Sequence, residues 1–245
     1  MTLYYRTKAF VFKKEDRSEA DRIFSAFTQD FGRIDILGKA IRKIHSKLRG
    51  GIELFTLSDI TFIQGKNIKK LTDANFVEKF GSIAQIPEKF EIAAAIARTI
   101  DCFIRGEEKD EGIFDILHQV FSILNKDTLD TKLYWLVYYY FMWNFFSVLG
   151  HRPELSVCAV CRQKLNPYHL YFSNREGGVI CKNCSLRNQE ALKIKSDTVK
   201  ILRLILQKDW DIVARLKIEA SFKKSFTEVS NYYSQYLLLT YSKQQ

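Results

Sequence analysis

The chain has 245 residues, of which 47% are hydrophobic and 27% charged, a composition typical of globular proteins. Three prolines and eleven glycines argue against long disordered linkers. The formal net charge of +10 is uneven: residues 1–80 carry 16 Lys/Arg against 10 Asp/Glu, residues 81–150 carry 6 against 10, and residues 151–245 carry 16 against 8. Two basic ends around an acidic middle indicate contacts with a polyanion. The alternative is a basic surface that binds no partner.

The first residues contain no apolar run of signal-peptide length, and we expect a cytoplasmic protein. Residues 133–150 carry no charge, but four tyrosines and Asn144 make this segment a poor membrane span. We predict a helix that is buried on nearly all sides within a bundle.

The first 80 residues predict five short strands, which are rich in β-branched or aromatic residues and separated by polar or glycine-containing stretches. Five strands in this length favour a small closed barrel such as the OB-fold, although an SH3-like barrel would have a similar sequence. The predicted strands are Thr7–Phe12, Arg22–Thr28, Arg33–Leu37, Ile52–Leu57 and Ile60–Ile63.

From Pro87 the apolar residues recur at helical spacing, and the predicted class is α+β. Domain 1–80 is the barrel, and domain 81–245 is helical with a cysteine-bearing insert at about 155–187. The expected helices run over Pro87–Gly106, Ile113–Leu124, Thr128–Leu149 with Gly150 as the stop, Ser196–Gln207 with Ser196 as N-cap, and Phe222–Tyr241.

Four cysteines form two C-x2-C pairs that are separated by 19 residues: Cys158 with Cys161, and Cys181 with Cys184. This spacing is typical of a zinc ribbon, because the two thiolates of each pair can turn toward one tetrahedral ion. The intervening stretch, with Gly177-Gly178, predicts a hairpin that returns the chain to the first pair. Two disulfides are the alternative, which a reducing cytoplasm disfavours. Four thiolates leave no open position for water, so we expect one structural Zn²⁺.

The fifth cysteine, Cys102, lies on an apolar helix face, where we expect it to pack in the core. His151 and His169 flank the cysteine region, but four cysteines leave neither histidine needed as a ligand.

The order of motifs around the cysteines resembles the bacterial recombination mediator family RecO. The stretch from Leu149 to Leu155 leads into the first pair, and Tyr171–Cys181 matches a pattern F-S-x-x-x-G-G-x-x-C before the second. The layout of the whole chain, an OB-fold followed by a helical domain with a zinc insert, is also similar to that family.

The resemblance implies a function that composition and spacing do not. It implies binding to single- and double-stranded DNA, annealing of complementary strands, and loading of RecA with the help of RecR onto DNA coated by single-stranded DNA-binding protein. It also implies that the protein associates with the nucleoid.

The family commonly has a basic block of the type K-G-A-R-R-x-K-S after the third strand. Here Ala40-Ile41 replaces the usual Gly-Ala pair. Between positions 33 and 49 there is one acid, Asp35, and a flexible basic loop can track a phosphate backbone without reading sequence. The candidate DNA-binding residues are Arg33, Lys39, Arg42, Lys43, Lys47 and Arg49.

Aromatic residues crowd the segment from Tyr134 to Phe146, where they occupy every side of the predicted helix. Such a distribution favours core packing over base stacking. On the barrel, Phe10, Phe12, Phe31 and Phe62 are the better candidates for stacking on bases.

An enzyme acting on nucleic acid is the competing class. A metal-dependent nuclease needs converging carboxylates, and no D-x-D cluster occurs in the basic regions. A phosphate-binding loop would need G-x-x-x-x-G-K-[ST], which Gly38-Lys39-Ala40 does not match. We therefore expect a binding protein that is not an enzyme. A zinc-ribbon RNA-binding or transcription-associated adaptor is the other alternative.

The last third is basic and strongly apolar, which suits an acidic peptide that ends in bulky apolar residues. The family resemblance implies such a ligand, the C-terminal tail of single-stranded DNA-binding protein. Residues 187–245 are the expected site, with Lys200 and Arg203 as rim candidates; the alternative is that both apolar faces are used in the core.

Overall fold

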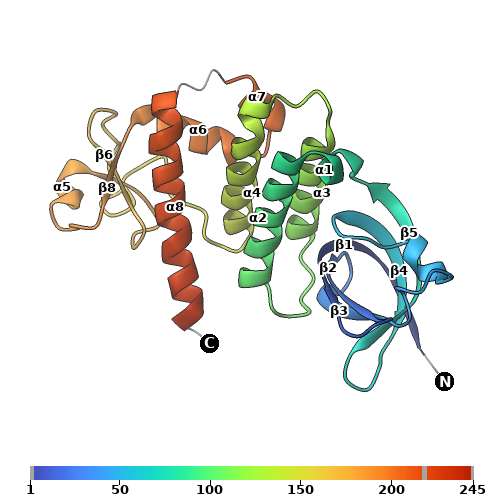
Figure 1. The fold of residues 1–245 in the computed structure, drawn as a ribbon. Helices are drawn as coiled ribbons and strands as arrows, with labels where there is room; N and C mark the ends of the chain where they lie inside the picture. Colours follow the sequence, from blue (N-terminus) through green and yellow to red (C-terminus); the bar gives the residue numbers. More distant parts are fainter. Residues whose placement is uncertain (1–2, 217–219, 244–245) are drawn as a thin grey trace. The chain divides into compact units, whose positions relative to one another are not determined.

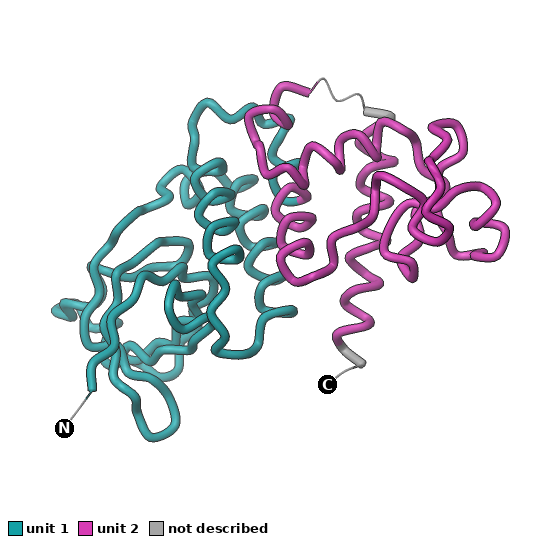
Figure 2. Tube along the Cα trace, turned by 180° about the vertical axis from the view of Figure 1, so that it is seen from behind, with its two compact units in different colours: residues 1–138 teal, residues 139–245 magenta. Residues whose placement is uncertain are grey.

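The computed structural model describes residues 3–216 and 220–243. It divides the chain into two compact units, residues 1–138 and 139–245, which Figure 2 shows in separate colours. The division falls inside helix α4 (Tyr134–Val148). Among the described residues, no helix is long and apolar enough to cross a membrane.

Five strands form a closed barrel in the order β1-β2-β3-β5-β4 (Figure 1). They are β1 (Tyr4–Asp16), β2 (Arg22–Thr28), β3 (Gly32–Gly38), β4 (Thr56–Ile63) and β5 (Lys69–Lys79). All neighbours are antiparallel except β3 and β5, which pair in parallel over two residues. This is the OB-fold that the sequence predicts.

Two of the predicted strands are wrong in detail. Ile52–Leu57 and Ile60–Ile63 are replaced by one continuous strand, β4, because Ser58 is buried in the ladder opposite Ala9. Ile52 lies in the preceding loop with its side chain buried. The fifth strand, β5, is missed because most of its side chains are exposed and give only a weak hydrophobic pattern.

Alternate residues of the strands fill the barrel. Buried side chains from all five strands meet inside it, and two isoleucines of the long β3–β4 loop, Ile41 and Ile52, close it from the side of that loop. The core residues are Ala9, Val11, Phe24, Ala26, Ile34, Ile36, Ile41, Ile52, Ile60, Phe62, Leu71 and Ala74.

Three helices pack against the barrel within the first unit: α1 (Gly81–Gln85), α2 (Pro87–Phe103) and α3 (Glu111–Asn125). Phe10 of β1 stacks on Phe80 with ring centroids 5.7 Å apart and also contacts Phe121 of α3 at 5.3 Å. These contacts join the barrel and the three helices in one compact unit that extends to residue 138. The division into a barrel over 1–80 and a helical domain over 81–245 stays a prediction.

The second unit contains most of α4, a three-stranded sheet and four further helices. The sheet has the order β7-β6-β8, and the helices are α5, a short turn beside β7, then α6, α7 and the long α8 (Figure 1). The bounds are β6 (Leu170–Ser173), β7 (Gly178–Cys181), α5 (Lys182–Ser185), β8 (Leu192–Ile194), α6 (Ser196–Ile205), α7 (Trp210–Ala214) and α8 (Ala220–Lys243).

The first unit also contains short 3-10 helices at Lys47–Gly50 and Thr131–Leu133.

The ends of two helices test the predicted caps. Gly150 adopts a φ of +88° just after α4, as expected for a helix stop. Ser196 is not the N-cap of α6: Lys195 holds that position with an extended backbone, and Ser196 is the first helical residue.

The aromatic residues of α4 pack in the core, as predicted. Trp143 stacks on Tyr233 of α8 with ring centroids 5.0 Å apart, meets Phe172 of β6 edge-on at 6.0 Å, and donates a hydrogen bond to Ser230 Oγ (2.9 Å). Trp143 therefore joins α4, α8 and the three-stranded sheet in one core.

Candidate metal centre and nucleic-acid interface

Two tight turns present the four cysteines of the second unit. In the first, Cys158 N donates to Gln163 O (2.9 Å) and Arg162 N donates to Cys158 O (2.9 Å), so the chain folds back on itself between Val157 and Lys164. In the second, Cys181 ends β7 and Cys184 lies in the single turn α5.

The β6–β7 hairpin brings the two turns together. Ala159 N donates to Val179 O (2.8 Å), and the Cys181 amide points at Cys158 Sγ (3.3 Å). The chain before the first turn also lies close to the hairpin at Gly178, where a side chain would not fit, because a Cβ there would lie 2.4 Å from Glu154 O. The predicted hairpin is therefore confirmed, with Gly177 at a positive φ of +62° in its turn.

The four cysteine sulfurs lie within 4.8 Å of one another, and Cys161 Sγ is 3.8 Å from Cys181 Sγ. Thiolates bound at about 2.3 Å to a tetrahedral ion stand roughly 3.8 Å apart, so the observed spacing fits such an ion. None of the four forms a disulfide. The cluster can therefore hold a metal ion, and four sulfurs would complete its coordination.

Backbone N–H groups make the thiol of Cys158 more acidic than an ordinary cysteine thiol. Burial raises its pKa, but the backbone N–H groups of Cys161, Cys181 and Val160 outweigh burial and lower the pKa to about 6. Burial and the neighbouring thiols raise the pKa of Cys184 to about 12. A cation held among the four sulfurs would favour all four thiolates.

Cys102, His151 and His169 are not part of the four-cysteine cluster. Cys102 is exposed, so its predicted core position is wrong: it follows Asp101 near the end of α2, on the solvent side of that helix. His151 accepts or donates a hydrogen bond with the hydroxyl of Tyr241 (3.1 Å), and burial lowers its pKa. His169 is exposed beside β6.

The basic loop that follows β3, residues 39–51, is anchored to the β1–β2 turn. Ala40 N donates to Asp21 Oδ1 (2.7 Å), and Arg42 donates through its backbone to Ala20 O (3.0 Å) and through its side chain to Ser18 O (2.8 Å). Ala40 has a φ of +55°, a conformation that favours glycine, which is the residue the family pattern has at this point. The loop is thus fixed at its start.

Five of the six candidate DNA-binding residues are exposed, and four of these are free of side-chain partners among the described residues: Lys39, Lys43, Lys47 and Arg49. Within the described part of the chain, none of these four makes an ion pair. Arg42 differs, because it shares Asp16 (3.4 Å) with Arg22. The Arg22 guanidinium holds the pKa of the Asp16 carboxyl below its ordinary value, so that carboxylate stays charged and paired. Ile44, at 83% exposure, lies between the free lysines.

Arg33 has a different environment. Its guanidinium donates to Asp101 Oδ1 (2.6 Å) and to Ile104 O, which ties β3 to the end of α2. The barrel aromatics proposed for base stacking are also occupied, because Phe10, Phe12 and Phe62 are buried. Phe31 is partly buried and packs edge-on against Phe62 at 5.4 Å.

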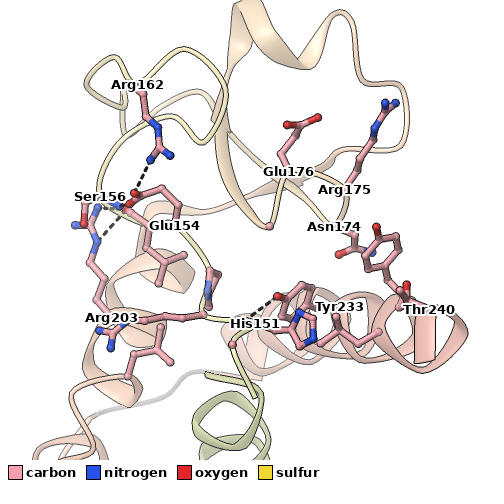
Figure 3. Close-up of a pocket in the computed structure, with 18 of the residues that line it drawn as sticks. His151, Glu154, Ser156, Arg162, Asn174, Arg175, Glu176, Arg203, Tyr233 and Thr240 are labelled. Atoms are coloured by element: carbon pink, nitrogen blue, oxygen red, sulfur yellow. Dashed lines mark hydrogen bonds and ion pairs between the residues drawn. The ribbon is translucent and has the colours of Figure 1, made fainter. Parts of the chain in front are cut away.

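A hollow of about 820 Å³ lies in the second unit between α6, α8 and the chain around the cysteine region (Figure 3). Leu206, Tyr233 and Leu237 form apolar parts of its wall. Asn174 donates to Tyr232 O (3.0 Å), while its buried Oδ1 has no partner among the described residues and remains a free acceptor.

Arginines surround this hollow. Arg203 of α6 donates to Leu155 O, and Arg162 pairs with Glu154 (3.0 Å). Arg152 and Arg175 are exposed and make no ion pair within the described residues. The structure thus brings Arg203 to the hollow, whereas Lys200 lies outside its lining and pairs with Asp197 (3.1 Å).

Arg152 and Arg175 are pocket residues that were not among the predicted partner-binding residues. Both arginines lie within the motif stretches on which the family resemblance rests, and those motifs could have pointed to them. Their convergence with α8 depends on how the β6–β7 hairpin folds against that helix, which no local pattern encodes.

An OB-fold barrel with a cationic loop, followed by a helical part in which a small inserted sheet carries a four-cysteine centre, defines a class of nucleic-acid-binding architecture. Comparison with known proteins is more specific. The family model "Recombination protein O N terminal" matches residues 1–80, and "Recombination protein O C terminal" matches residues 86–244.

Curated relatives span most of the chain. "DNA repair protein RecO" of Dehalococcoides mccartyi (strain ATCC BAA-2266 / KCTC 15142 / 195) is 34% identical over 217 residues, covering 87% of this chain and 83% of the relative. Proteins of the same name from Roseiflexus sp. (strain RS-1) and Desulforamulus reducens (strain ATCC BAA-1160 / DSM 100696 / MI-1) are 27% and 24% identical, each over 96% of this chain and over 81% and 90% of the relative. The chain belongs to the RecO family of DNA repair proteins.

The cysteine cluster predicts that the purified chain holds one metal ion. Cys158→Ser should lose this ion and loosen residues 155–187 while the barrel stays folded, because the ion closes the two turns on each other. Metal content and limited proteolysis measure the two effects.

Cys102→Ser is the matched control, since it removes the exposed cysteine outside the cluster. It should keep the metal and the proteolytic pattern of the parent. A folded parent without metal, or a Cys158→Ser variant that retains it, would show that the cluster is not a metal site.

Proposed function

We propose that this protein is a DNA-binding recombination mediator. It binds single- and double-stranded DNA, anneals complementary strands and, together with RecR, helps to load RecA onto DNA coated by single-stranded DNA-binding protein. It acts by binding and carries out no catalysis. The observation that carries the proposal is the set of unpaired cations on the loop after β3 of the OB-fold, in a chain of the RecO family.

The loop suits contact with phosphates rather than with particular bases. Lys39, Lys43 and Lys47 are exposed on a segment whose start is fixed to the β1–β2 turn. Cations held in this way can follow a phosphate backbone at a smaller loss of conformational entropy than cations on a wholly free loop. No sequence preference is expected from such contacts.

The ion in the cysteine cluster is, in this proposal, Zn²⁺ with a structural role. Thiolates are soft ligands, and a tetrahedral set of four thiolates is typical of zinc. The ion supplies a fixed point that holds the two cysteine turns together. Elemental analysis should give one zinc per chain, and iron or no metal would contradict this assignment.

Binding to mixed-sequence single strands should weaken steeply with salt. In the triple variant Lys39→Glu, Lys43→Glu, Lys47→Glu, the slope of log affinity against log salt should flatten by about 2, since each lost phosphate contact removes roughly 0.7. The loss of affinity should be equal on all sequences. Fluorescence anisotropy over a salt series gives both quantities.

A charge-matched control changes Arg98, Lys126 and Lys132 to Glu, three exposed residues on the helices of the same unit. The control should keep the salt slope of the parent. If the loop variant binds as tightly as the parent at each salt concentration, the DNA surface lies elsewhere. Preference for RNA in competition, without strand annealing, would favour an RNA-binding adaptor instead.

The hollow of the second unit is the proposed site for the acidic tail of single-stranded DNA-binding protein. Arg152 and Arg175 offer free cations for carboxylates, and Tyr236 and Leu237 offer apolar surface for a bulky end residue. Asn174 Oδ1 can accept a hydrogen bond from a peptide N–H. Because burial lowers the pKa of His151, the positive charge comes from the arginines at neutral pH.

A labelled acidic peptide with an aromatic end residue should bind the parent, and the double variant Arg152→Glu, Arg175→Glu should weaken binding by more than about tenfold at low salt. Added salt should weaken parent binding in the same direction. Lys200→Glu with Lys224→Glu is the matched control, because both are exposed on helices outside the lining. Equal loss in the control, or no parent binding at tens of micromolar, would refute this site.

A further inference from the structure

Over β6 and β8 the three-stranded sheet turns part of one face to solvent, whereas Ile180, the β7 partner of Tyr171, is buried. In the register of β6 and β8, Tyr171 lies opposite Lys193. Leu170 and Phe172 are buried, so Tyr171 points to the other side, and Lys193 is exposed while Ile194 is buried. Because side chains of a strand alternate, and because Lys195 continues the extended backbone (φ −85°, ψ 151°), Lys193 and Lys195 share the face of Tyr171.

A rigid turn presents a second tyrosine just before β6. Tyr168 is 83% exposed, more than any other aromatic residue in the described part of the chain. Its backbone N–H donates to Asn166 Oδ1 (3.0 Å), His169 N donates to Asn166 O (3.1 Å), and Pro167 restricts the chain between them. The ring is therefore held in solvent by the fixed turn, without packing to account for it.

The surrounding segment is strongly basic. Residues 155–195 carry seven Lys/Arg and two Glu, and a metal ion with four thiolates would add about −2, which leaves an excess of positive charge. Within the described residues, only Arg162 of these seven basic side chains forms an ion pair. The seven are Arg162, Lys164, Arg175, Lys182, Arg187, Lys193 and Lys195.

We infer that the exposed face of β6 and β8 with Tyr171, Lys193 and Lys195, together with Tyr168 on the turn that leads into β6 (the tyrosine and lysine face), is a second contact site for single-stranded DNA. Aromatic rings can stack only on bases whose faces are open, and duplex DNA hides those faces between its base pairs. Free lysines beside the rings match the phosphates that connect such bases. The face thus suits a single strand better than a duplex or an acidic protein surface.

The inference deepens the proposed function and rests on it, since the ligand is the same. The loop after β3 belongs to the first compact unit and the tyrosine and lysine face to the second. Two separate sites would let one chain hold two single strands and so bring complementary strands together for annealing. The loop then contributes charge contacts, and the face contributes stacking.

The test uses the full-length, metal-loaded chain. Single strands that contain 5-iodouracil should photo-crosslink to the peptide that carries Tyr168. In the background of Lys39→Glu, Lys43→Glu, Lys47→Glu, the remaining affinity for single strands should fall about fivefold or more on Tyr168→Ala, whereas Tyr168→Phe, which keeps the ring, should retain it. Lys193→Glu with Lys195→Glu should also weaken binding and flatten its salt slope.

Two controls keep the outcome clear. Lys200→Glu with Lys224→Glu makes the same charge change on helices of the same unit, and metal content with circular dichroism shows that each variant is folded. If Tyr168→Ala and the Lys193/Lys195 variant bind and anneal DNA like the parent, the face serves another partner and the inference is overturned, while the loop proposal stands. If the parent itself binds no DNA, the proposed function fails as well.

Discussion

The cysteine region of the second unit depends on the closure of two cysteine turns on each other. The sheet between them has strands of only four, four and three residues, too short to be stable as an isolated sheet. The Cys181 amide on Cys158 Sγ and the bond from Ala159 to Val179 set the turns in register, and an ion among the four sulfurs would lock them. Asn174 and Arg175, at the hollow, and Tyr171, on the free face of the sheet, all belong to this hairpin or the loop that it closes. A metal ion that contacts neither DNA nor peptide would thus support two separate binding surfaces.

The first unit relies on different interactions. Its barrel is closed by backbone pairing and filled by apolar side chains, and the loop after β3 is held by Asp21 and by the contacts of Arg42. Arg42 is therefore largely a positioning residue for the loop, and the charge that remains free lies on its neighbours. The same principle separates Arg33, whose guanidinium joins β3 to α2, from the exposed lysines. Charge in a basic stretch acts on a ligand only where the fold leaves it unpaired.

The sequence predicted features whose chemistry is local. The C-x2-C spacing, the Gly177-Gly178 turn and the buried helix around Trp143 were all correct, because each depends on residues close together in the chain. Features set by distant partners were missed. Strand β5 has few buried side chains and is defined by its pairing with β4. Cys102 faces solvent although apolar residues recur along its helix, and Phe10 is covered by Phe80 and Phe121 rather than free to stack on bases. The exposure of Tyr168 and the position of Lys193 beside Tyr171 likewise appear only in the folded structure.

The central claim is that one chain holds two single strands, one on each compact unit. Native mass spectrometry with short non-complementary strands, of about eight nucleotides so that one strand fits one site, counts them directly. The account predicts two strands bound per metal-loaded chain at saturation, and one after the metal has been removed, because the barrel loop survives and the sheet of the second unit does not. A single strand per chain both before and after metal removal would contradict it.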